Sequence, residues 1–161
     1  MIRLLEVGFG TGLNAALTAA DTDFPVHYIS LELYPLDREF AKRLGYDTPL
    51  LSQVIDAPWD TTAEIRNGFI LDKRISDFLN SPLPEDIDVV YFDAFAPEKQ
   101  PEMWSEDAIR RVYDCMASNG VLTTYCAKGS VRRMLQNTGF VVERIAGPPG
   151  GKREILRATK P

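Results

Sequence analysis

The chain has 161 residues, of which 45% are hydrophobic and 25% charged, and its formal net charge is −5. This length and balance predict one globular domain with a real core. The acidic excess argues against a generic, sequence-blind nucleic-acid binder.

The chain begins with a pattern that predicts strand, tight turn and helix. Residues 2–7 are a continuous apolar run, typical of a buried parallel strand, and residues 13–20 predict a helix. Between them, glycines alternate as G-x-G-x-G, and Glu6 stands two residues ahead of the first. The turn that binds a dinucleotide has a different spacing, G-x-G-x-x-G. A carboxylate at the position of Glu6 would also repel a pyrophosphate, whereas it would attract an ammonium group. The pattern therefore resembles the first motif of S-adenosylmethionine (SAM) methyltransferases, with a ligand-free glycine turn as the alternative.

The second predicted strand, residues 27–32, ends in Glu32, twenty residues after Gly12. Nucleotide-binding sheets place at this point the acid that bonds the ribose hydroxyls. The alternative is an exposed acid at a strand end. Residues 36–44 predict a helix that Gly45 stops.

Residues 50–66 are less regular and suggest amphipathic helices with a break near Pro58, while residues 69–75 predict a third strand. SAM-binding domains often carry after this strand an acid that accepts a bond from the adenine amino group. Asp77 is the candidate for that role. Asp72 competes with it but lies inside the strand, where it is expected to face solvent.

The rest of the chain continues the alternation of strands and helices. We expect strands at 87–93, 121–126, 140–144 and 154–158, helices at 102–116 and 130–137, and a turn at Asn119-Gly120. The last two strands lack room for a crossover helix and should form an antiparallel hairpin. The pattern predicts an α/β, Rossmann-like fold with a mostly parallel seven-stranded sheet. Ligands of such sheets bind at the carboxyl ends of the strands, where four acids fall.

Asp93 directly follows the fourth predicted strand, in the run Asp93-Ala94-Phe95-Ala96-Pro97. Amino-methylating enzymes keep an acidic or amide residue, an aromatic residue and a proline at this point. An alkylamine is mostly protonated at pH 7, so a carboxylate can bind the ammonium, accept its proton or hold the free amine in line. The alternative for Asp93 is a structural cap on the loop. We expect Phe95 to pack near the cofactor or the target base.

Metal and thiol chemistry are not expected. Cys115 and Cys126 form no C-x-x-C pair, and His27 is the single histidine, so a Cys/His metal cluster is unlikely on composition. His27 begins an apolar strand, which favours a structural role over a catalytic triad. Without a membrane-length apolar run or a visible signal peptide, we predict a cytoplasmic protein with reduced thiols and no membrane partner.

The run from Asp93 to Ser105, DAFAPEKQPEMWS, resembles a signature of the tRNA 5-methylaminomethyl-2-thiouridine methyltransferases. These are the stand-alone MnmD proteins and the methyltransferase half of bifunctional MnmC. Residues 6–14, 129–140 and 152–156 are also similar to that family. The resemblance implies a class I methyltransferase fold, with SAM as cofactor and the anticodon stem-loop of tRNA as partner. It implies methylation of the 5-aminomethyl nitrogen of the (2-thio)uridine at the wobble position.

The resemblance also implies roles for individual residues. The methionine side of SAM would be held by Glu6, Gly8, Gly10, Gly12 and Asn14. Glu32 would hold the ribose and Asp77 the adenine end, while Asp93 would face both the transferring methyl and the acceptor amine. No metal is required, because the sulfonium is itself the electrophile.

Basic residues late in the chain suggest an RNA partner. The candidates for phosphate contact are Lys128, Arg132, Arg133, Lys152, Arg153 and Arg157, with a solvated basic face as the alternative. Phe95 and Trp104 are candidates for stacking on a splayed wobble base. Trp104, at the start of a helix, has a core anchor as its alternative role.

Two departures from the family qualify this expectation. We expect a single domain over residues 1–161 that lacks the usual segment ahead of the glycine turn, and no fused oxidase domain is expected in this chain. Two other hypotheses stay open: a SAM methyltransferase of a small-molecule amine, and a SAM-binding fragment that is inactive without its upstream segment.

Overall fold

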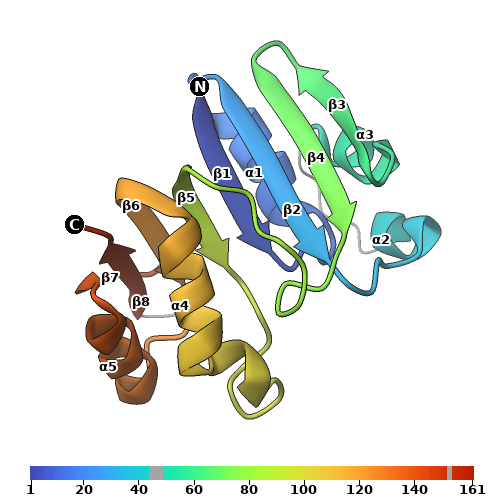
Figure 1. The fold of residues 1–161 in the computed structure, drawn as a ribbon. Coiled ribbons are helices and arrows are strands. Elements are labelled where there is room, and N and C mark those ends of the chain that lie inside the picture. Colours follow the sequence, from blue (N-terminus) through green and yellow to red (C-terminus); the bar gives the residue numbers. More distant parts are fainter. Residues whose placement is uncertain (44–48, 152–153) are drawn as a thin grey trace. The chain divides into compact units, whose positions relative to one another are not determined.

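The computed structural model describes residues 1–43, 49–151 and 154–161. They form two compact units, an N-terminal unit (Met1–Ser81) and a C-terminal unit (Pro82–Pro161), whose elements Figure 1 labels. The single domain expected over residues 1–161 stays a prediction. Across the described residues, no helix combines the length and the apolar composition needed to cross a bilayer.

The N-terminal unit has four strands in the order β3-β4-β2-β1. The pairs β1–β2 and β2–β4 are parallel, and β3 runs antiparallel to β4. The strands are β1 (Ile2–Val7), β2 (Val26–Glu32), β3 (Thr61–Arg66) and β4 (Phe69–Ile75), and the helices are α1 (Leu13–Asp21), α2 (Arg38–Arg43) and α3 (Leu51–Asp56). The central strands bury their apolar runs, as Leu5, Ile29 and Phe69 show with no exposed surface.

Strand β3 corrects the prediction of helices throughout residues 50–66. Only α3 is helical there, and residues 61–66 pair with β4 as a hairpin. The signal is the dipeptide Asn67-Gly68 between two β-prone segments, which is a strong short-range hairpin pattern. The predicted helix over 36–44 is confirmed as α2 at residues 38–43, and its predicted stop at Gly45 lies outside the described residues.

The C-terminal unit also has four strands, in the order β5-β6-β8-β7. The pair β5–β6 is parallel, and β8 runs antiparallel to both β6 and β7. The strands are β5 (Ile87–Phe92), β6 (Met116–Thr124), β7 (Val141–Ala146) and β8 (Glu154–Thr159), and the helices are η1 (Pro101–Trp104), α4 (Glu106–Cys115) and α5 (Gly129–Thr138). The expected C-terminal antiparallel hairpin is confirmed as β7–β8.

Two boundaries in the C-terminal unit differ from the prediction. The helix expected over 102–116 is split at Ser105, whose hydroxyl accepts a hydrogen bond from the amide of Ala108 at 3.1 Å and so begins α4. A serine in this position satisfies an open amide of the first helical turn. The turn expected at Asn119-Gly120 lies instead within β6, as a local irregularity where Asn119 has φ 65°.

The expected mostly parallel arrangement is confirmed within each unit, because three strands run in one direction and one runs against them. The described residues contain eight strands and not seven, and β3 is the additional one. Both cysteines are buried as free thiols, as expected, and burial raises the pKa of Cys115 to about 11.

In the C-terminal unit, Lys160 closes the carboxyl end of α4. Its Nζ donates hydrogen bonds to the carbonyl oxygens of Tyr113 at 2.8 Å and Met116 at 2.6 Å, and it lies 4.7 Å from the centre of the Tyr113 ring. The last carbonyls of a helix have no partner within it, and a cation there also complements the helix dipole.

We therefore expect Lys160→Met to lower the free energy of unfolding by about 1–3 kcal/mol, because it leaves part-buried carbonyls without donors. Urea unfolding followed by circular dichroism measures this. Lys99→Met removes a charge from an exposed position and serves as the control. Equal unfolding midpoints for the two variants would contradict the role given to Lys160.

Candidate functional site

The glycine turn between β1 and α1 has two glycines that perform different tasks. A Cβ added to Gly12, at φ 78°, would lie 2.9 Å from Cζ of Phe9 and 3.2 Å from Cγ1 of Val54, so this position requires glycine on both conformational and steric grounds. At Gly10, with φ 53°, an added Cβ would meet no described atom within 4 Å. The turn is therefore tightly packed against Phe9 and Val54 at Gly12, whereas the space beside Gly10 is open.

Glu6 holds the turn from below. The side chain has no exposed surface; its Oε2 accepts a hydrogen bond from the Ser30 hydroxyl at 2.7 Å, and its Oε1 accepts one from Nδ2 of Asn14 at 3.1 Å. Asn14 lies in the first turn of α1, so the carboxylate ties β1 to both β2 and α1. Direct contact of Glu6 with a cofactor ammonium stays a prediction, because the carboxylate is enclosed in this conformation.

Glu32, at the end of β2, meets the same turn. Its Oε2 accepts a hydrogen bond from the amide of Gly10 at 3.2 Å, and its Oε1 accepts one from the amide of Tyr34 at 2.9 Å. Each carboxylate oxygen has capacity for a further bond. The structure thus brings together the predicted residues Glu6, Asn14, Glu32 and the three glycines.

Asp77 organises the loop that follows β4. Its Oδ1 accepts a hydrogen bond from the amide of Leu79 at 2.9 Å, and its Oδ2 accepts one from Nδ2 of Asn80 at 2.6 Å. Its role toward an adenine stays a prediction. The competing acid, Asp72, is only 13% exposed in its side chain and pairs with Arg74 at 2.6 Å within β4, so the solvent-facing position expected for it was wrong.

In the C-terminal unit, residues 93–105, here called the signature loop, are fixed through their backbone. The amide of Phe95 donates to Oε1 of Gln100 at 3.1 Å, and its carbonyl accepts from Nε1 of Trp104 at 2.7 Å. The hydroxyl of Tyr125 donates to the carbonyl of Ala94 at 2.8 Å. Asp93, which directly follows β5, is exposed, and its charge contributes to raising the pKa of Tyr125, after burial and Cys126.

The two aromatic residues proposed for stacking differ in exposure. The Phe95 side chain is 68% exposed, whereas Trp104 is 5% exposed and packs edge-on against Phe92 at a centroid distance of 5.1 Å. Trp104 therefore takes the core-anchor role in this structure. Its indole holds the backbone of Phe95, and the ring that remains available for stacking is that of Phe95.

The basic candidates are less free than the sequence suggested. Lys128 forms an ion pair with Glu98 of the signature loop, while Arg132 is half-buried and Arg133 exposed on α5. On the hairpin, Arg157 pairs with Glu143 at 2.7 Å. Lys152 and Arg153 lie outside the described residues.

Sequence reasoning missed several residues that shape these two portions of the chain: Ser30, Phe9 and Trp59 in the N-terminal unit, and Gln100 and Tyr125 in the C-terminal unit. A signal existed for Gln100, which lies inside the signature loop. No local pattern marks Ser30 or Tyr125, because their partners are distant in the sequence.

The fold and the glycine turn with its two acids define a Rossmann-like methyltransferase. A family model described as S-adenosyl-L-methionine-dependent methyltransferase matches residues 67–161. The chain therefore belongs to this family of SAM-dependent enzymes.

Individual relatives are consistent with that membership. A tRNA 5-methylaminomethyl-2-thiouridine biosynthesis bifunctional protein MnmC of Marinomonas sp. (strain MWYL1) is 33% identical over 170 residues, which cover 94% of this chain and 25% of the relative. The protein of the same name from Idiomarina loihiensis is 35% identical, covering 95% of this chain and 29% of the relative. The crystal structure of MnmC2 from Aquifex aeolicus covers 99% of this chain and 54% of that one, with a TM-score of 0.72 and 24% identity. The chain thus spans about a quarter of the length of the curated relatives.

The N-terminal unit has features that fit the cofactor of this family. Gly10 leaves open space where a Cβ would otherwise stand, and Gly12, the N-cap residue of α1, makes no side-chain capping hydrogen bond. Open amides and a bare backbone accept an anionic group such as a carboxylate. Glu32 offers acceptor oxygens for hydroxyl groups beside the same turn.

The two glycines give a test of this fit. We expect Gly10→Ala to weaken SAM binding at least about tenfold while costing only about 1–2 kcal/mol of stability, since its Cβ enters open space at positive φ. Gly12→Ala should also lose binding, but with a larger fall in stability because the new Cβ clashes with Phe9. Calorimetric titration with SAM and thermal unfolding measure both effects. Unchanged SAM affinity in Gly10→Ala would contradict the prediction that SAM binds against the backbone of the turn at Gly10.

Proposed function

We propose that this chain transfers a methyl group from SAM to the exocyclic aminomethyl nitrogen on C5 of the wobble uridine of tRNA. The observation that carries the proposal is the signature loop, in which Gln100, Trp104 and Tyr125 bind the backbone while Asp93 and Phe95 keep exposed side chains. The matching relatives named for methylaminomethyl-thiouridine biosynthesis support the choice of substrate.

When bound, SAM supplies an electrophilic methyl on a sulfonium sulfur, and displacement requires a neutral amine lone pair in line with it. An alkylamine at pH 7 is an ammonium, so a proton must leave before attack. The carboxylate of Asp93 is suited to bind that ammonium, accept its proton at a carboxylate oxygen and orient the free amine. The exposed ring of Phe95, two residues on, offers a surface on which a splayed base can stack.

The contact with tRNA phosphates is assigned to Arg132 and Arg133 on α5, together with Lys128. Lys128 is paired with Glu98, so its ammonium must either bind the phosphate and Glu98 together or break the ion pair before it binds the phosphate. The small-amine alternative has no observation in its favour, since a small substrate needs neither a stacking ring nor a basic helix.

We expect Asp93→Ala to lower the rate of methyl transfer to tRNA at least about 100-fold, a typical loss for a general base. The substrate is bulk tRNA from cells that lack this final methylation, and labelled SAM is the donor. Asp93→Asn is the matched variant: it keeps the shape and hydrogen bonding but cannot accept the proton. If Asp93 is the base, Asn is as inactive as Ala; if it only positions the amine, Asn retains part of the rate.

Absence of label in tRNA with the wild-type chain, despite measurable SAM binding, would contradict the proposed substrate. It would favour a small-molecule amine or a chain that needs an additional segment. Full activity of Asp93→Ala on tRNA would contradict the role of the carboxylate while leaving the substrate assignment intact.

Phe95 provides a separate prediction for the nucleic-acid side. Loss of one base–aromatic stack costs about 1–3 kcal/mol, so Phe95→Ala should raise the KM for tRNA roughly 5- to 150-fold without changing SAM affinity. The matched control is Phe24→Ala, because Phe24 is 66% exposed against 68% for Phe95 and lies before β2 in the N-terminal unit. Equal KM values for the two variants would argue against stacking.

A further inference from the structure

Lys73 lies at a position in β4 where an apolar residue is expected. The buried side chains of this strand alternate as Phe69, Leu71 and Lys73, and the lysine is only 1% exposed. A buried ammonium is costly unless it is paired or well hydrogen-bonded. The cost indicates that the charge contributes something that an aliphatic side chain of similar length would not.

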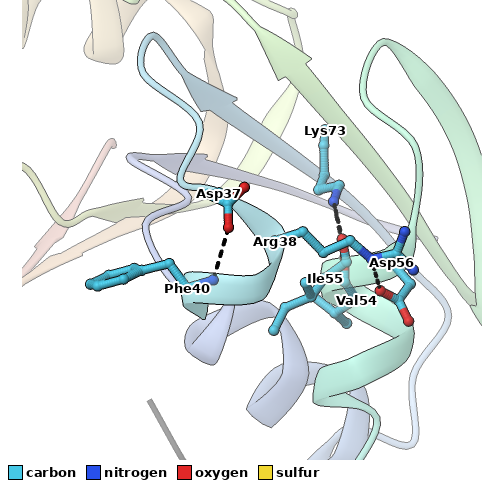
Figure 2. Close-up of polar contacts among 7 residues, drawn as sticks. All are labelled: Asp37, Arg38, Phe40, Val54, Ile55, Asp56 and Lys73. Atoms are coloured by element: carbon cyan, nitrogen blue, oxygen red, sulfur yellow. Dashed lines mark hydrogen bonds and ion pairs between the residues drawn. The ribbon is translucent and has the colours of Figure 1, made fainter. Parts of the chain in front are cut away.

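The Lys73 ammonium holds the carboxyl end of α3. Its Nζ donates hydrogen bonds to the carbonyl oxygens of Val54 and Ile55, both at 3.1 Å (Figure 2). Next to these carbonyls, Asp56 pairs with Arg38 of α2. Lys73 thus fixes the helix that packs beside the glycine turn.

The same ammonium lies against two aromatic rings, one of which belongs to the glycine turn. Nζ is 4.9 Å from the centre of the Phe9 ring and 4.7 Å from that of Trp59, and the two rings meet edge-on at 5.2 Å. A cation at these distances is attracted to the face of a ring, most strongly for tryptophan. Lys73 therefore draws Phe9 inward, toward Trp59 and α3.

Phe9 and α3 are also what Gly12 packs against. A Cβ at Gly12 would meet Phe9 Cζ at 2.9 Å and Val54 Cγ1 at 3.2 Å, and the amide of Gly12 donates to the carbonyl of Phe9 at 2.9 Å. Phe9 and Val54 thus lie close against Gly12, the N-cap residue of α1, so a shift of either side chain changes the packing of the turn. Lys73 therefore contacts Phe9 and α3, the two groups that pack against Gly12.

We propose that Lys73 is a positioning residue for the cofactor: its ammonium holds Phe9 and the end of α3 together, and so keeps the glycine turn shaped for SAM. The inference rests on the turn being the SAM site, as in the proposed function. Lys73 itself is not expected to touch the cofactor.

The matched control is Lys160, which uses the same chemistry in the C-terminal unit. It also donates to two carbonyls at a helix end and lies over an aromatic ring, at 4.7 Å from the Tyr113 centroid, but none of these partners belongs to the glycine turn. Lys73→Met should raise the dissociation constant for SAM about tenfold, measured by calorimetric titration, and Lys160→Met should leave it within twofold of wild type.

A pH profile separates a positioning role of the charge from a loss of packing alone. Burial lowers the pKa of Lys73 to about 8, while Asp56 on α3 raises it and Arg38 on α2 lowers it. Below pH 8 the ammonium is present, and above it the neutral amine binds the rings more weakly. The ratio of the SAM dissociation constants of Lys73→Met and wild type should therefore fall as pH rises from 7 to 9.5. The ratio is used because the amino group of SAM titrates in the same range for both proteins.

The outcomes are distinguishable. If the wild type does not bind SAM, the proposed function fails and the inference with it. If the wild type binds and Lys73→Met binds equally well, or if the ratio stays constant with pH, only the inference fails. Should Lys73→Met not fold, Trp59→Phe replaces it; this half-buried position weakens the hold on the ammonium, and SAM affinity should fall several-fold. Unchanged affinity in Trp59→Phe would overturn the inference.

Discussion

The glycine turn of the N-terminal unit depends on the enclosed carboxylate of Glu6. Glu6 and Ser30 are direct partners in the parallel register of β1 and β2, so the hydroxyl stands where the carboxylate needs a donor. Asn14 supplies a second donor from α1. Because burial of a charge without donors is strongly unfavourable, the enclosed carboxylate is stabilised only where the register of β1 and β2 and the start of α1 are both in place. Glu6, which the sequence predicts to bind SAM, is thus also the residue that holds β1, β2 and α1 together around the turn.

In both units a lysine donates hydrogen bonds to the carbonyl oxygens at the end of a helix, and the same ammonium lies over an aromatic ring. Lys73 does so for α3 and Lys160 for α4. The difference lies in the neighbours. Lys160 contacts groups of α4 and the start of β6, whereas Lys73 also reaches Phe9 inside the glycine turn. The lysine at a helix end is common to both units, and its contact with Phe9 is what connects Lys73 to the glycine turn.

The sequence predicted what local patterns encode. Buried parallel strands, the glycine turn and the acids that follow strands appear because apolar runs and glycine spacing are local signals, and Glu32 does meet Gly10. Strand β3 was missed because the helical interpretation of residues 50–60 was extended over residues 61–66, up to the turn at Asn67-Gly68. Trp104 shows the limit of residue type as evidence, since an indole suits both a stack and an anchor, and only its burial separates the two. The distant partners of Phe9 are Trp59 and Lys73, which come from two different segments, so no pattern along the chain predicts them.

The signature loop shows how a sequence motif can be mostly scaffold. Of its residues, Gln100 and Trp104 bind the backbone of Phe95, and Tyr125 from the segment after β6 binds that of Ala94. These bonds are made to main-chain atoms, so they fix the path of the loop whatever side chain stands at position 95. The exposed ring and the exposed acid are then held without losing much conformational freedom on binding, which favours affinity. A substitution at Gln100 or Trp104 should therefore resemble a substrate-binding defect, although neither side chain is positioned to read a base.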